Sequence, residues 1–204
     1  MTFLSAAQKA AIRLIGRKPT TFFSSSNTFE LEIVDLANEV AADIMQAHDW
    51  RLLTELNVMT GNGADIGFSL PTDYDRMLIK GSIFRPDWST WRYTPADDLD
   101  QWQDLLNGTA AIDPGFWIIL QGQLQFWPIL PSGEVAQHYY ISKNVVVDEN
   151  GVPKADFTTD SDSLRLDESL LTLGLIWRWR EQKRLAFSGD KENFDQKIEE
   201  TSAR

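Results

Sequence analysis

The spacing of hydrophobic residues changes twice along this chain of 204 residues. Near both ends, apolar side chains recur every three or four residues, as on one face of a helix, whereas between the ends they alternate as in a β-strand. We therefore predict an α+β fold, in which N-terminal and C-terminal helices form a helical bundle with an inserted antiparallel β-sheet. The expected domain is 1–204, with a helical core of residues 2–50 and 164–204 and a β-rich insertion of residues 51–163.

Two helices are expected before residue 50. The first, residues 2–16, has no acid and carries basic side chains four residues apart on one face, namely Lys9, Arg13 and Arg17. The second, residues 27–48, should begin with Asn27 as its cap and Glu30 completing a capping box. Outside its apolar stripe this second helix carries acids and no base. Such a face is either solvated or paired with the basic first helix in an antiparallel arrangement, and the sequence leaves both open.

The inserted segment is predicted to be rich in strands. Residues 53–60 and 66–70 flank Gly61-Asn62-Gly63, and this combination predicts a hairpin because Asn and Gly accept positive φ. Residues 76–84 can form another strand, and residues 96–106 a short acidic helix. Three later runs are separated by short turns and predict an antiparallel meander, namely residues 116–120, 123–129 and 135–142.

Charge and composition exclude several classes of protein. The chain has 19 basic and 30 acidic residues, a net charge of −11, so its surface as a whole repels nucleic acid and anionic lipid. It has no cysteine, which excludes disulfides, thiolate metal sites and cysteine nucleophiles. No stretch approaches the roughly 20 apolar residues of a membrane span, and Lys9 and Arg13 interrupt the first apolar segment, unlike a signal-peptide core. We expect a protein that is soluble, not exported and without a membrane partner.

Residues that could carry catalysis or hold a cofactor are few. His48 and His138 lie in a predicted helix end and a predicted strand, without a pattern of further ligands, and are expected to be structural. Acidic pairs occur at Asp97-Asp98, Asp160 with Asp162, and Asp167-Glu168, but such pairs arise freely in an acidic chain. No phosphate-binding or nucleophile motif is present. We therefore predict a protein that is not an enzyme, with no cofactor and no metal.

The longest helix signal runs from about residue 167 to residue 187. Successive helical residues lie about 100° apart, so Trp177 and Trp179 point in nearly opposite directions and cannot share one core face. Either this helix is central and packed on two sides, or one tryptophan and part of its basic cluster face another subunit. The remaining residues, 190–204, have little apolar surface and are expected to be loose in the isolated protein.

Several segments resemble one family when they are taken in order. They are Leu170 to Arg180 followed by Gln182 to Leu185, Leu70 to Arg76 with its preceding glycine-rich turn, Tyr139 to Asn144, Phe157 to Leu166, and Ala41 to Arg51. In order and spacing they resemble the head-tail adaptor proteins of tailed bacteriophages, also called connector or tail accessory proteins. The resemblance covers about residues 28–195, and no role is carried onto the first 25 residues.

The resemblance implies a structural protein of the virion neck, made in the host bacterial cytoplasm. It would bind below the portal protein as a ring of twelve copies, extend the DNA channel without binding DNA specifically, and offer a docking surface to a downstream tail or neck protein. The residues expected to contact the portal or a neighbouring copy are Trp177, Arg178, Trp179, Arg180, Lys183, Arg184, Phe194 and Ile198. The alternatives are a muralytic hydrolase of the phage particle, which needs two carboxylates across a cleft, and a generic helical scaffold.

Overall fold

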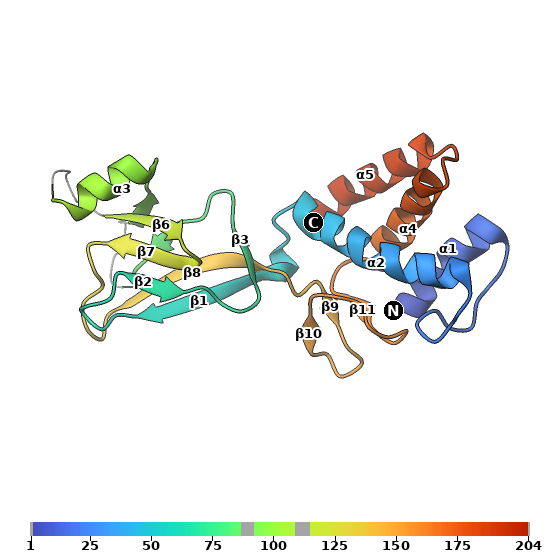
Figure 1. The fold of residues 1–204 in the computed structure, drawn as a ribbon, viewed down its shortest axis with the longest axis horizontal. Helices are drawn as coiled ribbons and strands as arrows, with labels where there is room; N and C mark the ends of the chain where they lie inside the picture. Colours follow the sequence, from blue (N-terminus) through green and yellow to red (C-terminus); the bar gives the residue numbers. More distant parts are fainter. Residues whose placement is uncertain (1, 87–91, 109–114, 204) are drawn as a thin grey trace. The chain divides into compact units, whose positions relative to one another are not determined.

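The computed structural model describes residues 2–86, 92–108 and 115–203 and divides into two compact units (Figure 1). The helical unit contains the described residues up to Leu53 and from Lys143 onward. The sheet unit is the segment Thr54–Ser142 between them. The predicted α+β class is therefore confirmed, with five helices and a large, mostly antiparallel sheet in the described part of the chain.

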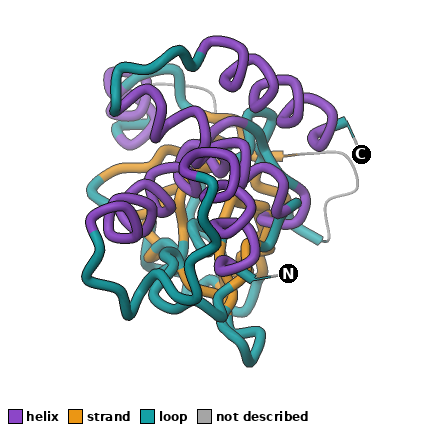
Figure 2. Tube along the Cα trace, turned by 90° about the vertical axis from the view of Figure 1, so that its right-hand side faces the viewer, coloured by secondary structure: helices purple, strands orange, loops and turns teal. Residues whose placement is uncertain are grey.

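In the helical unit three helices pack on a fourth. Helices α1 (Phe3–Ile15), α2 (Thr28–Ala47) and α5 (Ser188–Ser202) each contact α4 (Glu168–Gln182), and Figure 2 shows the helices as purple tubes. The buried residues of α4 form two runs on either side of the partly buried Leu173 rather than one stripe: Leu170, Leu171, Thr172, Gly174, Leu175, Ile176 and Trp177. A helix that is hydrophobic on all sides belongs in a core. The interpretation of this segment as a central helix is therefore confirmed.

Besides its helices, the helical unit contains one 3₁₀ turn and one small sheet. A 3₁₀ turn, η1 (Arg51–Leu53), follows α2, and a three-stranded sheet precedes α4. Its strands are β9 (Val146–Val147), β10 (Pro153–Lys154) and β11 (Ser163–Leu164), in the order β10-β9-β11. No helix in the described residues is both long and apolar enough to cross a bilayer.

The ends of the first two helices agree with the sequence only in part. Helix α1 ends at Gly16 with a left-handed φ of 66°, as expected for a glycine C-cap. Asn27 caps α2, since its Oδ1 accepts a hydrogen bond from the Phe29 amide at 3.1 Å. The predicted capping box is wrong, because the Glu30 carboxylate accepts a hydrogen bond from Arg17 at 2.7 Å instead. Glu30 thus pairs with Arg17, which follows α1, instead of accepting a hydrogen bond from the Asn27 amide as a capping box requires.

Of the two alternatives that the sequence left open, the antiparallel pair of α1 and α2 with ion pairs between the helices is not the arrangement observed. Both helices pack mainly on α4, and the acids of α2 that pair with another helix, Glu32 and Asp43, pair with the bases of α4. Arg17, which follows the end of α1, pairs with Glu30 of α2. The more hydrophobic α4 takes the central position because it has apolar residues on every side.

The C-terminal segment is more ordered than predicted. Helix α4 ends at Gln182 rather than at residue 187, and Arg184 adopts a left-handed φ of 56°. Helix α5 then spans 15 residues, with Phe194 buried. The expectation of a loose tail over residues 190–204 is therefore wrong. A short helix of low hydrophobicity is held here by tertiary packing on α4.

The sheet unit is built on one large sheet. Its strands are β1 (Thr54–Thr60), β2 (Gly67–Ser69), β3 (Tyr74–Met77), β4 (Ile83–Phe84), β5 (Arg92–Pro95), β6 (Phe116–Leu120), β7 (Gln123–Trp127) and β8 (Val135–Ser142). The strand order is β1-β8-β4-β5-β6-β7-β2, with β3 also paired to β8. Pairing is antiparallel except between β5 and β6. The one helix described in this unit is α3 (Leu99–Leu106), the predicted short acidic helix, which Asp98 caps.

The predicted hairpin across residues 61–63 is wrong. Strand β1 pairs with β8, and β2 pairs with β7. The Gly61 amide donates to the Glu134 carbonyl at 2.8 Å, and a Cβ on Gly61 would lie 2.4 Å from the Leu130 and Pro131 carbonyl oxygens. Gly61, directly after the end of β1, therefore allows a turn that is distant in sequence to approach the backbone closely.

The predicted meander is correct for its first two strands only. Strands β6 and β7 form an antiparallel hairpin, but β8 does not pair with β7. Its partners are β1, β3 and β4. Long-range pairing depends on which apolar faces meet, which local patterns do not record. The buried cluster of this sheet consists of Met59, Ile83, Tyr93, Leu124, Phe126, Leu130 and Ala136.

Candidate interaction surface

The residues predicted to face a partner lie on α4 and α5. Asp167 fixes the start of α4, since its Oδ1 accepts a hydrogen bond from the Ser169 amide at 2.9 Å. Burial opposes ionisation of Asp167, but this hydrogen bond and the nearby Lys197 outweigh it, and the pKa of the carboxyl lies below its ordinary value. A charged cap stabilises the first turn of α4, where the buried part of the helix begins. The basic residues follow toward the other end of the helix.

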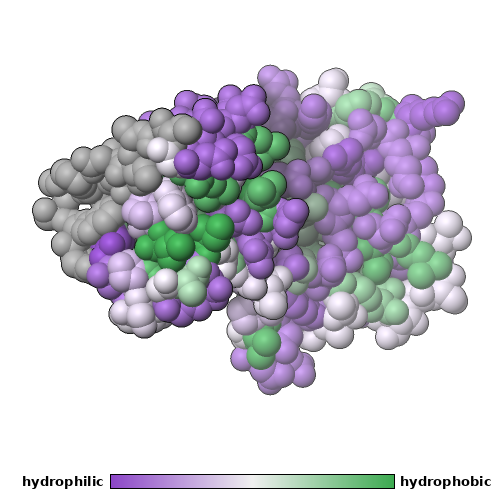
Figure 3. All heavy atoms as spheres, turned by 60° about the vertical axis from the view of Figure 1, so that its left-hand side comes forward, coloured by the Kyte–Doolittle hydropathy of each residue, from purple (hydrophilic) through white to green (hydrophobic). Residues whose placement is uncertain are grey.

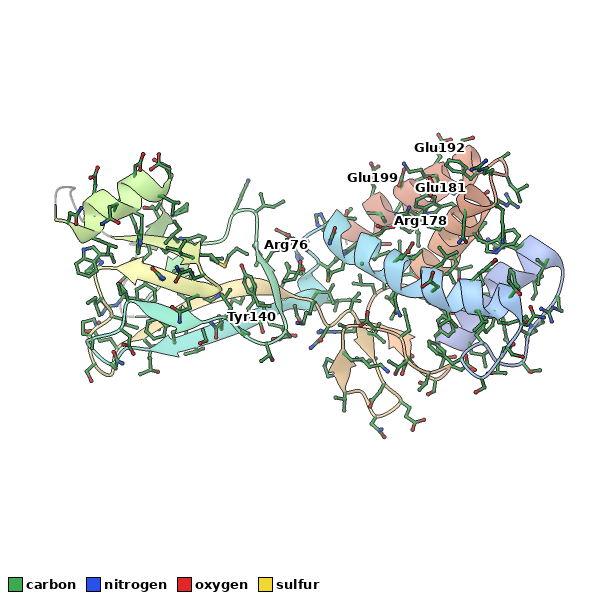
Figure 4. All side chains as sticks on the ribbon, viewed as in Figure 1. Arg76, Tyr140, Arg178, Glu181, Glu192 and Glu199 are labelled. Carbon is green, nitrogen blue, oxygen red and sulfur yellow. The ribbon has the colours of Figure 1, made fainter. Side chains whose placement is uncertain are left out.

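Arg178 connects α4 to α2. Its Nε donates to Asp43 Oδ2 at 3.0 Å, its Nη1 lies 3.3 Å from Glu181 Oε2, and its guanidinium lies 4.3 Å from the centre of the Trp177 ring. Figure 4 labels Arg178 and Glu181 on this helix. Burial disfavours the charged form, yet the hydrogen bond and charge of Asp43 raise the pKa of Arg178 above its ordinary value. Arg178 therefore holds two helices of the same chain together.

Trp179 and Lys183 make a second connection to α2. The Trp179 ring packs edge-on against Phe29 with centroids 5.7 Å apart, and its indole nitrogen donates to Glu32 Oε2 at 3.0 Å. The Lys183 ammonium pairs with Glu32 Oε1 and lies 5.7 Å from the Trp179 ring centre. On the other side, Arg180 pairs with Asp190 of α5. Most of the basic cluster is thus neutralised within the chain.

Two aromatic residues of the predicted set, Trp177 and Phe194, pack against each other inside the helical unit. Trp177 is 5% exposed and Phe194 is 4% exposed, with ring centroids 6.0 Å apart. Phe187 lies beside the same indole at 6.4 Å. Ile198 on α5 is partly buried, and Arg184 is exposed. The structure therefore places six of the eight predicted residues on α4 and α5, and the two exposed ones, Lys183 and Arg184, directly after the end of α4.

A basic groove on the other side of α4 was not assigned a role from the sequence. It has a volume of about 470 Å³ and is lined by Lys9, Arg13, Ser169, Thr172, Leu173 and Lys197. Lys9 lies 3.5 Å from Glu168, and Lys197 lies 3.1 Å from Asp167. The groove thus contains two lysines that pair with acids of the same chain, together with Arg13. The four-residue step from Lys9 to Arg13 was the sequence signal for this groove.

A larger cleft of about 530 Å³ has mixed chemistry. It is lined by His48, Asp49, Trp50, Arg51, Leu52, Leu166, Asp167, Thr201 and Ser202. Two carboxylates, Asp49 and Asp167, thus border one cleft, as a hydrolase would need. However, Asp167 caps α4 and forms an ion pair with Lys197, so its carboxylate has a structural role here.

The other acidic pairs serve local structure. The Asp160 carboxylate accepts hydrogen bonds from the Phe22 and Phe23 amides at 3.1 and 3.3 Å. Asp162 is buried, accepts from two backbone amides at 2.6 and 2.8 Å and pairs with Lys154. Across residues 2–86, 92–108 and 115–203 no three His, Asp or Glu side chains gather as metal ligands. The carboxylates of Asp160 and Asp162 therefore stabilise loops through hydrogen bonds to backbone amides.

The two histidines differ in environment. His138 is fully buried in the sheet unit, and burial lowers its pKa to about 4. Neither of its ring nitrogens has a hydrogen-bond partner among the described residues. His48 is exposed and its ring contacts Trp50 edge-on at 5.5 Å. His138 is therefore an electrically neutral core residue at pH 7.

Comparison with known proteins adds one finding. The sequence profile of the SU10 adaptor protein family matches residues 1–203, nearly the whole chain. A comparison with curated proteins gave no match.

Proposed function

The chain belongs to the SU10 adaptor protein family, a family of the phage adaptor type, and we propose that it is the structural head-tail adaptor of a tailed phage. In this proposal it occupies the neck of the virion, binds below the portal protein as a ring, with twelve copies expected, and offers a docking surface to a tail or neck protein. The match over residues 1–203 carries this proposal. A structural role without catalysis is what membership of an adaptor family suggests.

The division into two units supports separate tasks within the ring. We assign the ring body to the helical unit, because α4 ties α1, α2 and α5 into one core. We assign the outward or tail-side surface to the sheet unit. In Figure 3 hydrophilic side chains cover most of the visible surface, with hydrophobic patches among them, as expected of a protein with several interfaces.

The portal contact is placed at the end of α4 and on α5. There Lys183 and Arg184 are exposed, while Arg178 and Arg180 are braced by acids of the same chain. Arg178 lies over the Trp177 ring and Lys183 over the Trp179 ring, and Phe194 is buried beside Trp177. Charged residues held in fixed positions favour a specific partner over a nonspecific one.

The charge of the chain supports a role as a DNA conduit. Each copy carries −11, so a ring multiplies a negative charge that repels the phosphate backbone and lets DNA slide. We therefore expect negligible binding of linear duplex at physiological salt. Submicromolar, salt-sensitive binding would contradict this part of the proposal.

The test is assembly with the portal protein of the same phage. The mass of the isolated chain and of the mixture is measured by light scattering, and the mixture is imaged by electron microscopy. We expect a small species alone and a closed ring attached to the portal in the mixture. A chain whose mass and shape are unaffected by the portal would contradict the proposal.

A further inference from the structure

Helix α1 presents a basic and apolar stripe to solvent. Its buried side is made of Phe3, Ala6, Ala7, Ala10 and Ala11, which point toward the core. On the opposite side Ile12 is 51% exposed and Ile15 is 38% exposed, beside the exposed Lys9 and Arg13. Within the described residues Arg13 has no ion-pair partner. We call Lys9, Ile12, Arg13 and Ile15 the basic stripe.

Helix α2 presents an acidic stripe to solvent. Leu31 is 52% exposed, and Asp35, Glu39 and Ala42 follow on the same side at helical spacing. The neighbouring acids Glu32 and Asp43 are held by α4, whereas Asp35 and Glu39 pair with no base in the part of the chain that the structure describes. We call Leu31, Asp35, Glu39 and Ala42 the acidic stripe.

We propose that the basic stripe of one copy binds the acidic stripe of the next copy in the ring. Both stripes belong to the same helical unit, carry opposite charges and have exposed aliphatic side chains. Their charged residues have the same spacing, since Lys9 and Arg13 are one helical turn apart, as are Asp35 and Glu39. This inference rests on the proposed ring and names the side-to-side contact in it.

The basic groove of about 470 Å³ borders the basic stripe and could receive the Asp35 and Glu39 carboxylates of the next copy. Arg13, Lys9 and Lys197 line it, together with the hydroxyls of Ser169 and Thr172. The Ser169 and Thr172 hydroxyls already donate to Asp167 and to the Ala6 carbonyl, so a carboxylate entering this groove would meet the cations. Charge-assisted hydrogen bonds to such cations are the strong ones. Ile12 and Ile15 lie on the exposed side of the same helix and would be covered by the incoming helix.

A second copy fits both stripes, whereas any other partner fits only one. A polyanion could occupy the basic stripe but would be repelled by the acidic one and by the net charge of the chain. Two different patches that bind each other form a heterologous contact, and repeated heterologous contacts produce a closed ring when the rotation closes. In the proposed ring each copy uses its basic stripe on one side and its acidic stripe on the other, so every side-to-side contact is of this heterologous kind.

The absence of cysteine allows a direct test with introduced thiols. Ile12→Cys places a thiol in the basic stripe, and Ala42→Cys places one in the acidic stripe, with all charges kept. The two variants are mixed, with and without portal, treated with a short bis-maleimide and separated by denaturing electrophoresis. We expect covalent heterodimers in the mixture and a ladder of oligomers from the double variant. The matched control pairs Ile12→Cys with Leu99→Cys, an exposed apolar position of the sheet unit.

Charge reversal provides a second test in which folding is checked by rescue. One variant carries Lys9→Glu and Arg13→Glu, and the other carries Asp35→Lys and Glu39→Lys. Each alone places like charges across the contact and should lower ring occupancy on the portal at least tenfold. Mixing the two variants restores opposite charges at every contact and should restore the ring, which a misfolded variant could not do.

The outcomes separate this contact from the adaptor function. Rings on the portal with crosslinking no greater than in the control, or rings from either charge variant alone, would overturn the contact and leave the adaptor function standing. Specific crosslinking without attachment to the portal would support the contact and contradict the adaptor function. Binding of linear duplex DNA that Lys9→Glu with Arg13→Glu abolishes, without copy-to-copy crosslinking, would reassign the basic stripe to nucleic acid and overturn the proposal.

Discussion

Replacing Gly174 with alanine is the sharpest test of how the helical unit is packed. Gly174 lies in the interior of α4, where α2 and α5 both approach it. A Cβ at this position would lie 2.3 Å from Val40 Cγ1 and 3.2 Å from Phe194 Cε2. The new methyl group would therefore push against two helices at once.

Two opposing effects set the size of the change. Helix propensity favours alanine over glycine by about 1 kcal/mol in a helix interior. Carbon atoms in contact prefer separations of about 3.5–4.0 Å, so Val40 must move by more than 1 Å while Phe194 blocks movement on the other side. Overpacking of a close-packed core costs about 3 kcal/mol at the upper end of its usual range. We expect Gly174→Ala to lower the free energy of unfolding by a net value of about 2 kcal/mol.

The assay is urea unfolding of the full chain, followed by tryptophan fluorescence, with a thermal scan in parallel. The loss corresponds to a fall in Tm of about 6 °C for a chain of this size. Gly189→Ala is the matched control, because Gly189 lies in the first turn of α5 and a Cβ there would meet no atom within 4 Å. This control should be neutral or slightly stabilising.

A double variant shows whether Val40 is the cause. Val40→Ala removes the methyl group that Gly174→Ala would strike, so the double variant should be more stable than the sum of the two single changes by at least 0.5 kcal/mol, a value taken as roughly the smallest coupling seen between residues in contact. If Gly174→Ala stabilises the protein as much as Gly189→Ala does, α2 and α5 do not pack on α4 as described.

Three further predictions concern other parts of the chain. Because burial lowers the pKa of His138 to about 4, the unfolded chain binds a proton that the folded chain does not, and stability should fall as pH drops below 6.5. Urea titrations at pH 7 and pH 5 should show a loss of about 2 kcal/mol that His138→Leu removes. Asp162→Ala should cost about 3 kcal/mol in chemical unfolding, since it leaves two backbone amides and the partly exposed Lys154 without their buried carboxylate partner, whereas the exposed Asp156→Ala should cost almost nothing. Deleting residues 190–204 should expose Trp177, shift its fluorescence to longer wavelength and lower the thermal transition, and an unchanged transition would show that α5 does not support the core.

Local sequence patterns predict the helices of this chain better than its strand pairing. The glycine C-cap at Gly16 and the Asn27 cap were both found, because caps depend on residues adjacent in sequence. The Gly61-Asn62-Gly63 signal was misinterpreted as a hairpin because the same residues suit a tight turn and a close backbone approach. Only the position of the turn at residues 130–134, far along the chain, distinguishes the two.

The C-terminal segment shows a different limit of the sequence. Residues 190–204 have too little apolar surface to form a stable helix alone, and this estimate was sound for an isolated peptide. In the folded chain Phe194 enters a site made by Gly174 and Trp177, which lie on another helix. The stability of α5 therefore depends on a site whose existence no local pattern reveals.

The charges of the helical unit show why its surfaces could not be assigned from sequence. The bases of α4 and the acids of α2 each look like candidate binding faces, but Arg178 and Lys183 neutralise Asp43 and Glu32 when the two helices pack together. Pairing within the chain removes these four from the groups available to a partner. The acids that remain on α2, Asp35 and Glu39, then match the exposed bases Lys9 and Arg13 of α1 in charge and spacing. An internal ion pair thus decides which charged residues are left to bind the next copy.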